Sequence, residues 1–134
     1  VINLNPNIRR NRGWKYVFIV GNNGRERAPA MWLYPKDPWR VHFRLKTNRG
    51  WNIGADFSIP SKYRKWNRNI KISSRVRQVG RNISVKHYIN RRYVSRSLIR
   101  NQTLIPLPNR NLYIKHFGGS RLPFRVRYVR LTAR

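Results

Sequence analysis

The side chains that could carry acid–base or metal chemistry are few in this sequence and lie far apart. The only acids are Glu26, Asp37 and Asp56. Glycoside hydrolysis needs two carboxylates that flank one bond, and calcium takes about six to eight oxygen ligands, several of them from carboxylates. Three dispersed acids support neither chemistry. We therefore expect no enzyme activity, no metal, no cofactor and no small-molecule substrate.

Histidine is the other candidate for a general base or a metal ligand. The three histidines, His42, His87 and His116, fall in three different predicted strands. His87 alternates in phase with Ile83 and Val85, which favours a histidine packed in the core. The sequence contains no P-loop, no glycine-rich dinucleotide fingerprint, no Ser/His/Asp order and no cysteine.

Positive charge is the dominant feature of the chain. Lysine and arginine number 31 against three acids, which gives a net charge of +28. A compact domain with this charge repels itself unless counter-charge is supplied. Nucleic acid is the first expectation for the partner. An anionic membrane surface, an acidic glycan and an acidic protein remain open.

The elements that position these cations are predicted to be strands. Short apolar or alternating runs bounded by Gly, Pro and Asn recur along the chain, and this pattern predicts an all-β antiparallel two-sheet sandwich with little or no helix. We expect one sandwich domain over residues 14–134, preceded by a basic N-terminal arm over residues 1–13. The predicted strands are Trp14–Val20, Ala30–Tyr34, Arg40–Lys46, Trp51–Phe57, Asn69–Val79, Asn82–Ile89, Tyr93–Ile99, Leu112–Phe117 and Phe124–Leu131.

The alternation places most basic residues on the faces of strands that point away from the core. A phase shift near the end of the last strand indicates a bulge. Trp51 and Trp66 are interpreted as core residues, although aromatic residues among arginines could also stack on bases. We predict that the polyanion is bound by arginines of the arm and of the strands: Arg9, Arg10, Arg12, Arg75, Arg77, Arg125, Arg127 and Arg130.

The order of features from Trp14 to Leu131 resembles a laminin G-like, or concanavalin A-like, jelly-roll domain. The segments that carry the resemblance are Gly21–Gly24, Ala28–Tyr34, Val41–Leu45, Trp66–Ile72, Ile83–Asn90, Tyr93–Ser97, Ile105–Pro108, Asn111–Ile114, Gly118–Gly119 and Phe124–Leu131. The resemblance implies a jelly-roll sandwich and a fold that also serves as a lectin. This sequence departs from the family pattern where Arg91 replaces a turn glycine and where Arg125 and Arg127 replace acids.

Three functions follow as hypotheses. Similar domains are encoded by large DNA viruses, so the first is a non-enzymatic structural protein of a large assembly, such as a minor capsid or virion-internal component. There it would contact neighbouring subunits and the genome, an anionic membrane or an acidic subunit. The second is a ribosomal or other ribonucleoprotein component that binds RNA inside the cell. The third is a carbohydrate-binding lectin, which the scarcity of carboxylates opposes.

Overall fold

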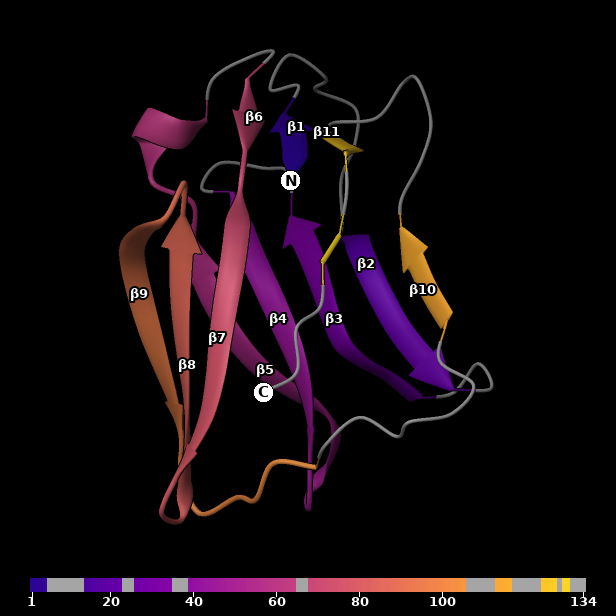
Figure 1. Cartoon of the computed structure of the whole chain (residues 1–134), viewed down its shortest axis with the longest axis vertical. Coiled ribbons are helices and arrows are strands. Elements are labelled where there is room, and N and C mark those ends of the chain that lie inside the picture. The colour runs from indigo at the N-terminus through magenta and orange to yellow at the C-terminus, as the bar shows by residue number, and fades with distance from the viewer. Residues whose placement is uncertain are drawn as a thin grey trace.

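The chain folds as a sandwich of two antiparallel layers (Figure 1). The computed structural model describes residues 1–4, 14–22, 26–34, 39–64, 68–105, 113–116, 124–127 and 129–130. Their strands are β1 (Ile2–Leu4), β2 (Lys15–Asn22), β3 (Glu26–Tyr34), β4 (Arg40–Thr47), β5 (Gly50–Ser58), β6 (Asn69–Ile70), β7 (Ile72–Val79), β8 (Asn82–Ile89), β9 (Arg92–Ile99), β10 (Tyr113–His116) and β11 (Phe124–Val126). Among the described residues the only helical element is the short 3-10 turn η1 (Ser61–Tyr63). This part of the chain has no helix that is long and apolar enough to cross a membrane. The predicted all-β antiparallel sandwich is confirmed.

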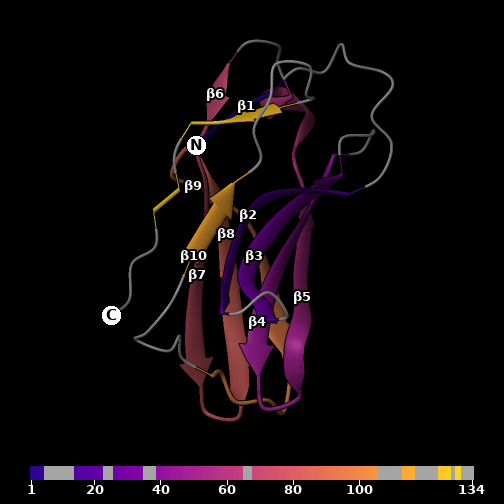
Figure 2. The ribbon, with the colours of Figure 1, turned by 90° about the vertical axis from the view of Figure 1, so that its right-hand side faces the viewer.

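The two layers are built from different parts of the chain. One layer is a five-stranded sheet with the order β10-β2-β3-β4-β5. The other holds the sheets β7-β8-β9 and β11-β1-β6, and β6 leads directly into β7. Figure 2, which views the sandwich from the side, shows β7 and β8 on one side and the β3, β4 and β5 strands on the other. Each layer therefore has one face toward the core and one face toward solvent.

Strict alternation in β4 and β8 fills the space between the layers. In β8 the residues Ile83, Val85, His87 and Ile89 are all fully buried, whereas the residues between them are half-buried or exposed. Strand β4 shows the same pattern, with Val41, Phe43 and Leu45 inward. Burying apolar side chains in this way contributes about 25 cal/mol per Å² of surface removed from water.

Tight turns set the register of the β7-β8-β9 sheet. Gly80 has a φ of 58° in the turn between β7 and β8. Asn90 and Arg91 have φ values of 50° and 67° in the turn between β8 and β9, which is the geometry of a type I′ hairpin turn. The turn glycine expected after Asn90 is thus replaced by an arginine in the left-handed conformation.

Several element boundaries differ from the sequence-based expectations. The start of the predicted arm, Ile2–Leu4, is a strand that pairs with both β11 and β6, and residues 5–13 lie outside the described part. The predicted strand Asn69–Val79 is broken at Lys71, because the chain changes partner there from β1 to β8. Asn90 holds this break with two hydrogen bonds, one from its backbone N–H to the Lys71 carbonyl and one from the Lys71 N–H to its side chain. The last strand ends at Val126, and the bulge predicted near Tyr128 falls on a residue outside the described part of the chain.

Candidate polyanion interface

The solvent-facing side of β7-β8-β9 carries a row of cations, which we call the basic row: Arg75, Lys86 and Arg96. Each comes from a different strand, and Lys86 is directly opposite both Arg75 and Arg96. All three are exposed. Directly opposite residues of antiparallel strands have Cβ atoms about 4.5–5.5 Å apart, and like charges in such positions destabilise the sheet. The basic row therefore has a folding cost that a bound anion would offset.

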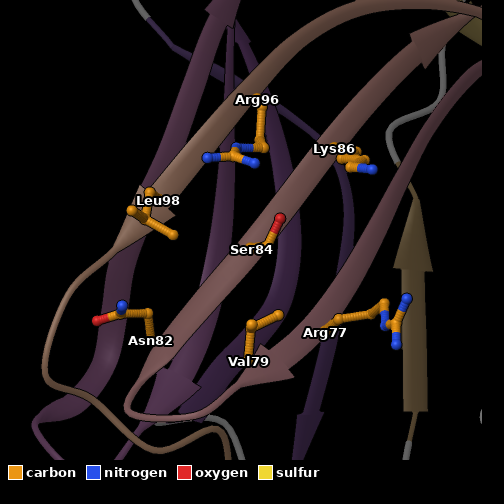
Figure 3. Close-up of a pocket in the computed structure, with 7 residues that line it drawn as sticks. All are labelled: Arg77, Val79, Asn82, Ser84, Lys86, Arg96 and Leu98. Carbon is orange, nitrogen blue, oxygen red and sulfur yellow. The ribbon is translucent and has the colours of Figure 1, made fainter.

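A shallow hollow of about 230 Å³ lies beside the basic row (Figure 3). Arg77, Lys86 and Arg96 surround it, Ser84 lies between them, and apolar Val79 and Leu98 line the same hollow. Arg77 is directly opposite Ser84, one step along the sheet from the basic row. Guanidinium, ammonium and hydroxyl groups are all hydrogen-bond donors, so several of the side chains that line the hollow can donate to anionic groups.

Aromatic side chains lie at the other side of the basic row. The Arg75 guanidinium is 5.0 Å from the centre of the Tyr88 ring, a cation–π contact. Tyr88 in turn meets Tyr93 edge to face at 6.0 Å. Tyr93 is 60% exposed, so one aromatic ring beside the cations remains accessible to a ligand.

No carboxylate opposes these cations within their own sheet, because strands β7, β8 and β9 contain neither Asp nor Glu. The sequence contains no acid at all after Asp56. Asp56 is on β5 of the other layer, where its Oδ1 is 2.5 Å from His42 Nδ1. The partner of Asp56 is thus the histidine opposite it on β4.

The arginines predicted to bind the polyanion lie in different parts of the structure. Arg75 and Arg77 are exposed on the outer face of β7, as expected. Arg125 is opposite Asn3 in β11, and Arg127 follows that strand and donates its backbone N–H to the Val1 carbonyl. Arg130 is exposed and outside the described strands. The remaining candidates, Arg9, Arg10 and Arg12, lie outside the described residues.

Sequence reasoning missed Lys86 and Arg96. The two-residue turn at Gly80 sets β7 against β8 in a register that places Arg75 opposite Lys86, so hairpin geometry could have found the first pair. Arg96 depends on an irregularity: His87 pairs with Ser95 but Tyr88 pairs with Tyr93, which leaves Val94 as an extra residue. Because a shift of one residue reverses the face of every side chain beyond it, the bulge turns Arg96 outward.

The outer face of the five-stranded sheet carries a second group of side chains, which we call the aromatic–arginine face: Trp14, Trp32, Tyr34, Arg40, Arg44 and Trp51. The Arg44 guanidinium lies 5.3 Å from the Trp32 ring centre and 5.2 Å from that of Trp51. Arg40 lies 5.5 Å from Trp14 and 5.2 Å from Tyr34. The interpretation of Trp51 as a core residue is wrong, since it is 37% exposed and stacks on Arg44. Trp66 lies outside the described residues.

His87 confirms the prediction of a core histidine. Its side chain is fully buried, its ring stacks on Phe57 at 4.3 Å, and its Nδ1 lies 2.9 Å from the Ser74 hydroxyl. Burial lowers the pKa of His87 to about 4, although the charge of Asp56 acts in the opposite direction. Within the described ranges, no three His, Asp or Glu side chains are close enough together to hold a metal ion.

Comparison of the chain with protein-family models, with curated proteins and with solved structures finds no match. The resemblance to laminin G-like domains therefore stays a prediction.

Proposed function

We propose that this protein is a non-enzymatic structural component of a larger assembly, and that it holds a polyanion on the outer face of β7-β8-β9. The observation that carries the proposal is the basic row. Lys86 is directly opposite both Arg75 and Arg96 on three adjacent strands, and those strands contain no acid. A sheet that served only structure would gain stability from opposite charges at these positions.

The surroundings of the basic row support a phosphate-bearing partner. Three of the four cations beside the hollow and in the basic row are arginines, and the guanidinium fork matches phosphate oxygens in a bidentate manner. This face is built from strands β7, β8 and β9 and has no helix that could read bases in a groove. We therefore propose that the protein binds the nucleic-acid backbone without reading its sequence. Nucleic acid is the polyanion that we propose.

The test measures the salt dependence of binding to a labelled duplex DNA. If Arg75, Arg77, Lys86 and Arg96 each neutralise one phosphate, log K falls against log salt with a slope of about −3 to −4. The double variant Arg75→Gln/Arg96→Gln removes two contacts, so its slope is expected to be smaller in magnitude by about 2.

Arg40→Gln/Arg44→Gln is the matched control, because it removes the same charge from the opposite layer. The two layers of a sandwich lie about 10 Å apart, and the screening length at about 0.1 M salt is also about 10 Å. The control is therefore expected to keep the wild-type slope. Equal loss of slope in both double variants, or binding that does not depend on salt, would overturn the proposal.

The setting of the assembly follows from the resemblance and stays a prediction: the inner region of a virion, or alternatively a ribonucleoprotein particle. The same titration with duplex DNA and with RNA of equal length separates the two settings. Tighter binding of RNA at every salt concentration would favour the ribonucleoprotein alternative.

A further inference from the structure

The aromatic–arginine face has a composition that the polyanion proposal does not explain. Tryptophan, tyrosine and arginine are the residues most enriched at the energetic centres of protein–protein interfaces. Here they come from the start of β2 and from β3, β4 and β5, all on the solvent side of one sheet. Trp14 and Trp51 remain 39% and 37% exposed.

The contacts within this face hold the two guanidinium groups in place. Arg44 is within 5.3 Å of two indole rings and Arg40 within 5.5 Å of an indole and a phenol ring. Tyr16 packs edge to face on Trp32 at 5.8 Å, which fixes that ring from its other side. A side chain that is already ordered loses less entropy on binding. Arg40, which is exposed, is therefore preorganised to present its N–H edge to a carboxylate, whereas Arg44 is partly buried and holds the Trp32 and Trp51 rings.

Three observations decide which partner fits. A second copy of this chain is disfavoured, since each copy carries +28 and Asp56, an acid on β5 of this sheet, is already held by His42. Stacking of unpaired bases needs free ring faces, and here Arg40 and Arg44 cover faces of four rings. An acidic protein segment fits this face better, because its carboxylates can reach the exposed Arg40 guanidinium and its apolar side chains can cover the exposed parts of the indoles.

We propose that the aromatic–arginine face binds an acidic segment of a second protein, with Arg40 as the carboxylate-binding residue and Trp14 and Trp51 as the apolar contacts. This site is separate from the basic row, on the opposite layer of the sandwich. The inference does not require that the basic row bind nucleic acid, so the two proposals can fail independently.

The test uses a fluorescently labelled synthetic peptide of alternating Glu and Leu, whose binding to the full chain is measured by anisotropy. Poly-glutamate of equal length lacks the apolar side chains and is expected to bind at least about tenfold more weakly. The Arg40→Gln/Arg44→Gln variant is expected to bind the peptide about tenfold or more weakly than the wild type, because charge-assisted hydrogen bonds are lost. Trp51→Ala is expected to weaken it by several-fold.

The matched control is Arg75→Gln/Arg96→Gln, which removes the same charge from the other layer and is expected to bind the peptide as the wild type does. Protein already saturated with duplex DNA is expected to bind the peptide with unchanged affinity. If the Arg75/Arg96 variant loses peptide binding, or if DNA displaces the peptide from the wild-type protein, the inference is overturned and the peptide is assigned to the basic row.

A folding defect in the Arg40/Arg44 variant would obscure the result, so Arg40→Lys provides a second measurement. This change keeps the charge but removes the planar group that contacts Trp14 and Tyr34. Weaker peptide binding by Arg40→Lys, with an unchanged melting temperature, supports a preorganised arginine. Unchanged binding contradicts it, because a simple attraction between charges would then suffice.

Discussion

His87 shows how the surroundings of one residue fix its protonation state. Its ring lies between the layers, stacked on Phe57 and edge to face with Phe43, and it has no exposed surface. Because burial penalises the charged form, the pKa of His87 is lowered to about 4 from its ordinary value of 6.5. The sequence has only three acids, so fewer carboxylates than usual contribute to acid denaturation.

The first prediction concerns acid stability. Between about pH 4 and 6.5 the unfolded chain binds a proton at residue 87 that the folded chain excludes, so the free energy of unfolding falls as the pH is lowered through this range. The loss is at most about 3 kcal/mol. Urea denaturation at several pH values checks it. His87→Gln is expected to show a much flatter pH dependence, and equal slopes in the two proteins would contradict the role of His87.

Among the elements, the turn between β8 and β9 is the one where the sequence departs from the best turn chemistry. Arg91 has a φ of 67°, and a side chain in this region costs about 1–2 kcal/mol. We predict that Arg91→Gly raises the free energy of unfolding by about 0.5–1 kcal/mol, since glycine removes the strain but makes the unfolded chain more flexible. Chemical denaturation measures the change. A destabilised Arg91→Gly protein would show that the arginine side chain makes a stabilising contact.

Lys86, the middle residue of the basic row, is predicted to affect folding stability and DNA binding in opposite ways. Lys86 is opposite Arg75 on one side and Arg96 on the other. Lys86→Glu replaces two repulsive pairs by two attractive ones, so the free energy of unfolding is expected to rise by about 1 kcal/mol. Affinity for duplex DNA is expected to fall. A variant that is both less stable and unchanged in DNA binding would contradict this account of the sheet.

Sequence reasoning succeeded where a single strand contains the information. The alternation in β8 predicted the inward positions of Ile83, Val85 and His87, and the alternation in β7 predicted exposed arginines. It failed where the answer depends on a distant partner. The break at Lys71 depends on β1, and the direction of Arg96 depends on an extra residue in β9.

Trp51 gives a second example of this limit. Large aromatic residues are usually buried, and nothing in the sequence near Trp51 identifies Arg44 as its partner. The contact exists because β4 and β5 pair across a short turn with a register irregularity between Leu45 and Thr47. A local pattern cannot reveal such a pairing before the sheet is assembled.

For the whole molecule, the net charge of +28 is the property with the widest effect. Raising the salt concentration from about 0.1 M to about 1 M shortens the screening length from about 10 Å to about 3 Å. Because self-repulsion destabilises the compact state, we predict that the melting temperature of the free protein rises over this range of sodium chloride. Thermal denaturation followed by circular dichroism measures it. A melting temperature that falls with added salt would show that attractive ion pairs outweigh the repulsion.

The opposition of the two faces has a geometric consequence. The basic row and the aromatic–arginine face belong to different layers and point away from each other, and the layers themselves are about 10 Å apart. Two ligands held on these faces would be kept at a separation fixed by the packed core and not by a flexible tether. In an array of many copies, such a spacer would give the layer of polyanion and the layer of partner protein one constant distance, which small-angle scattering would record as a regular repeat.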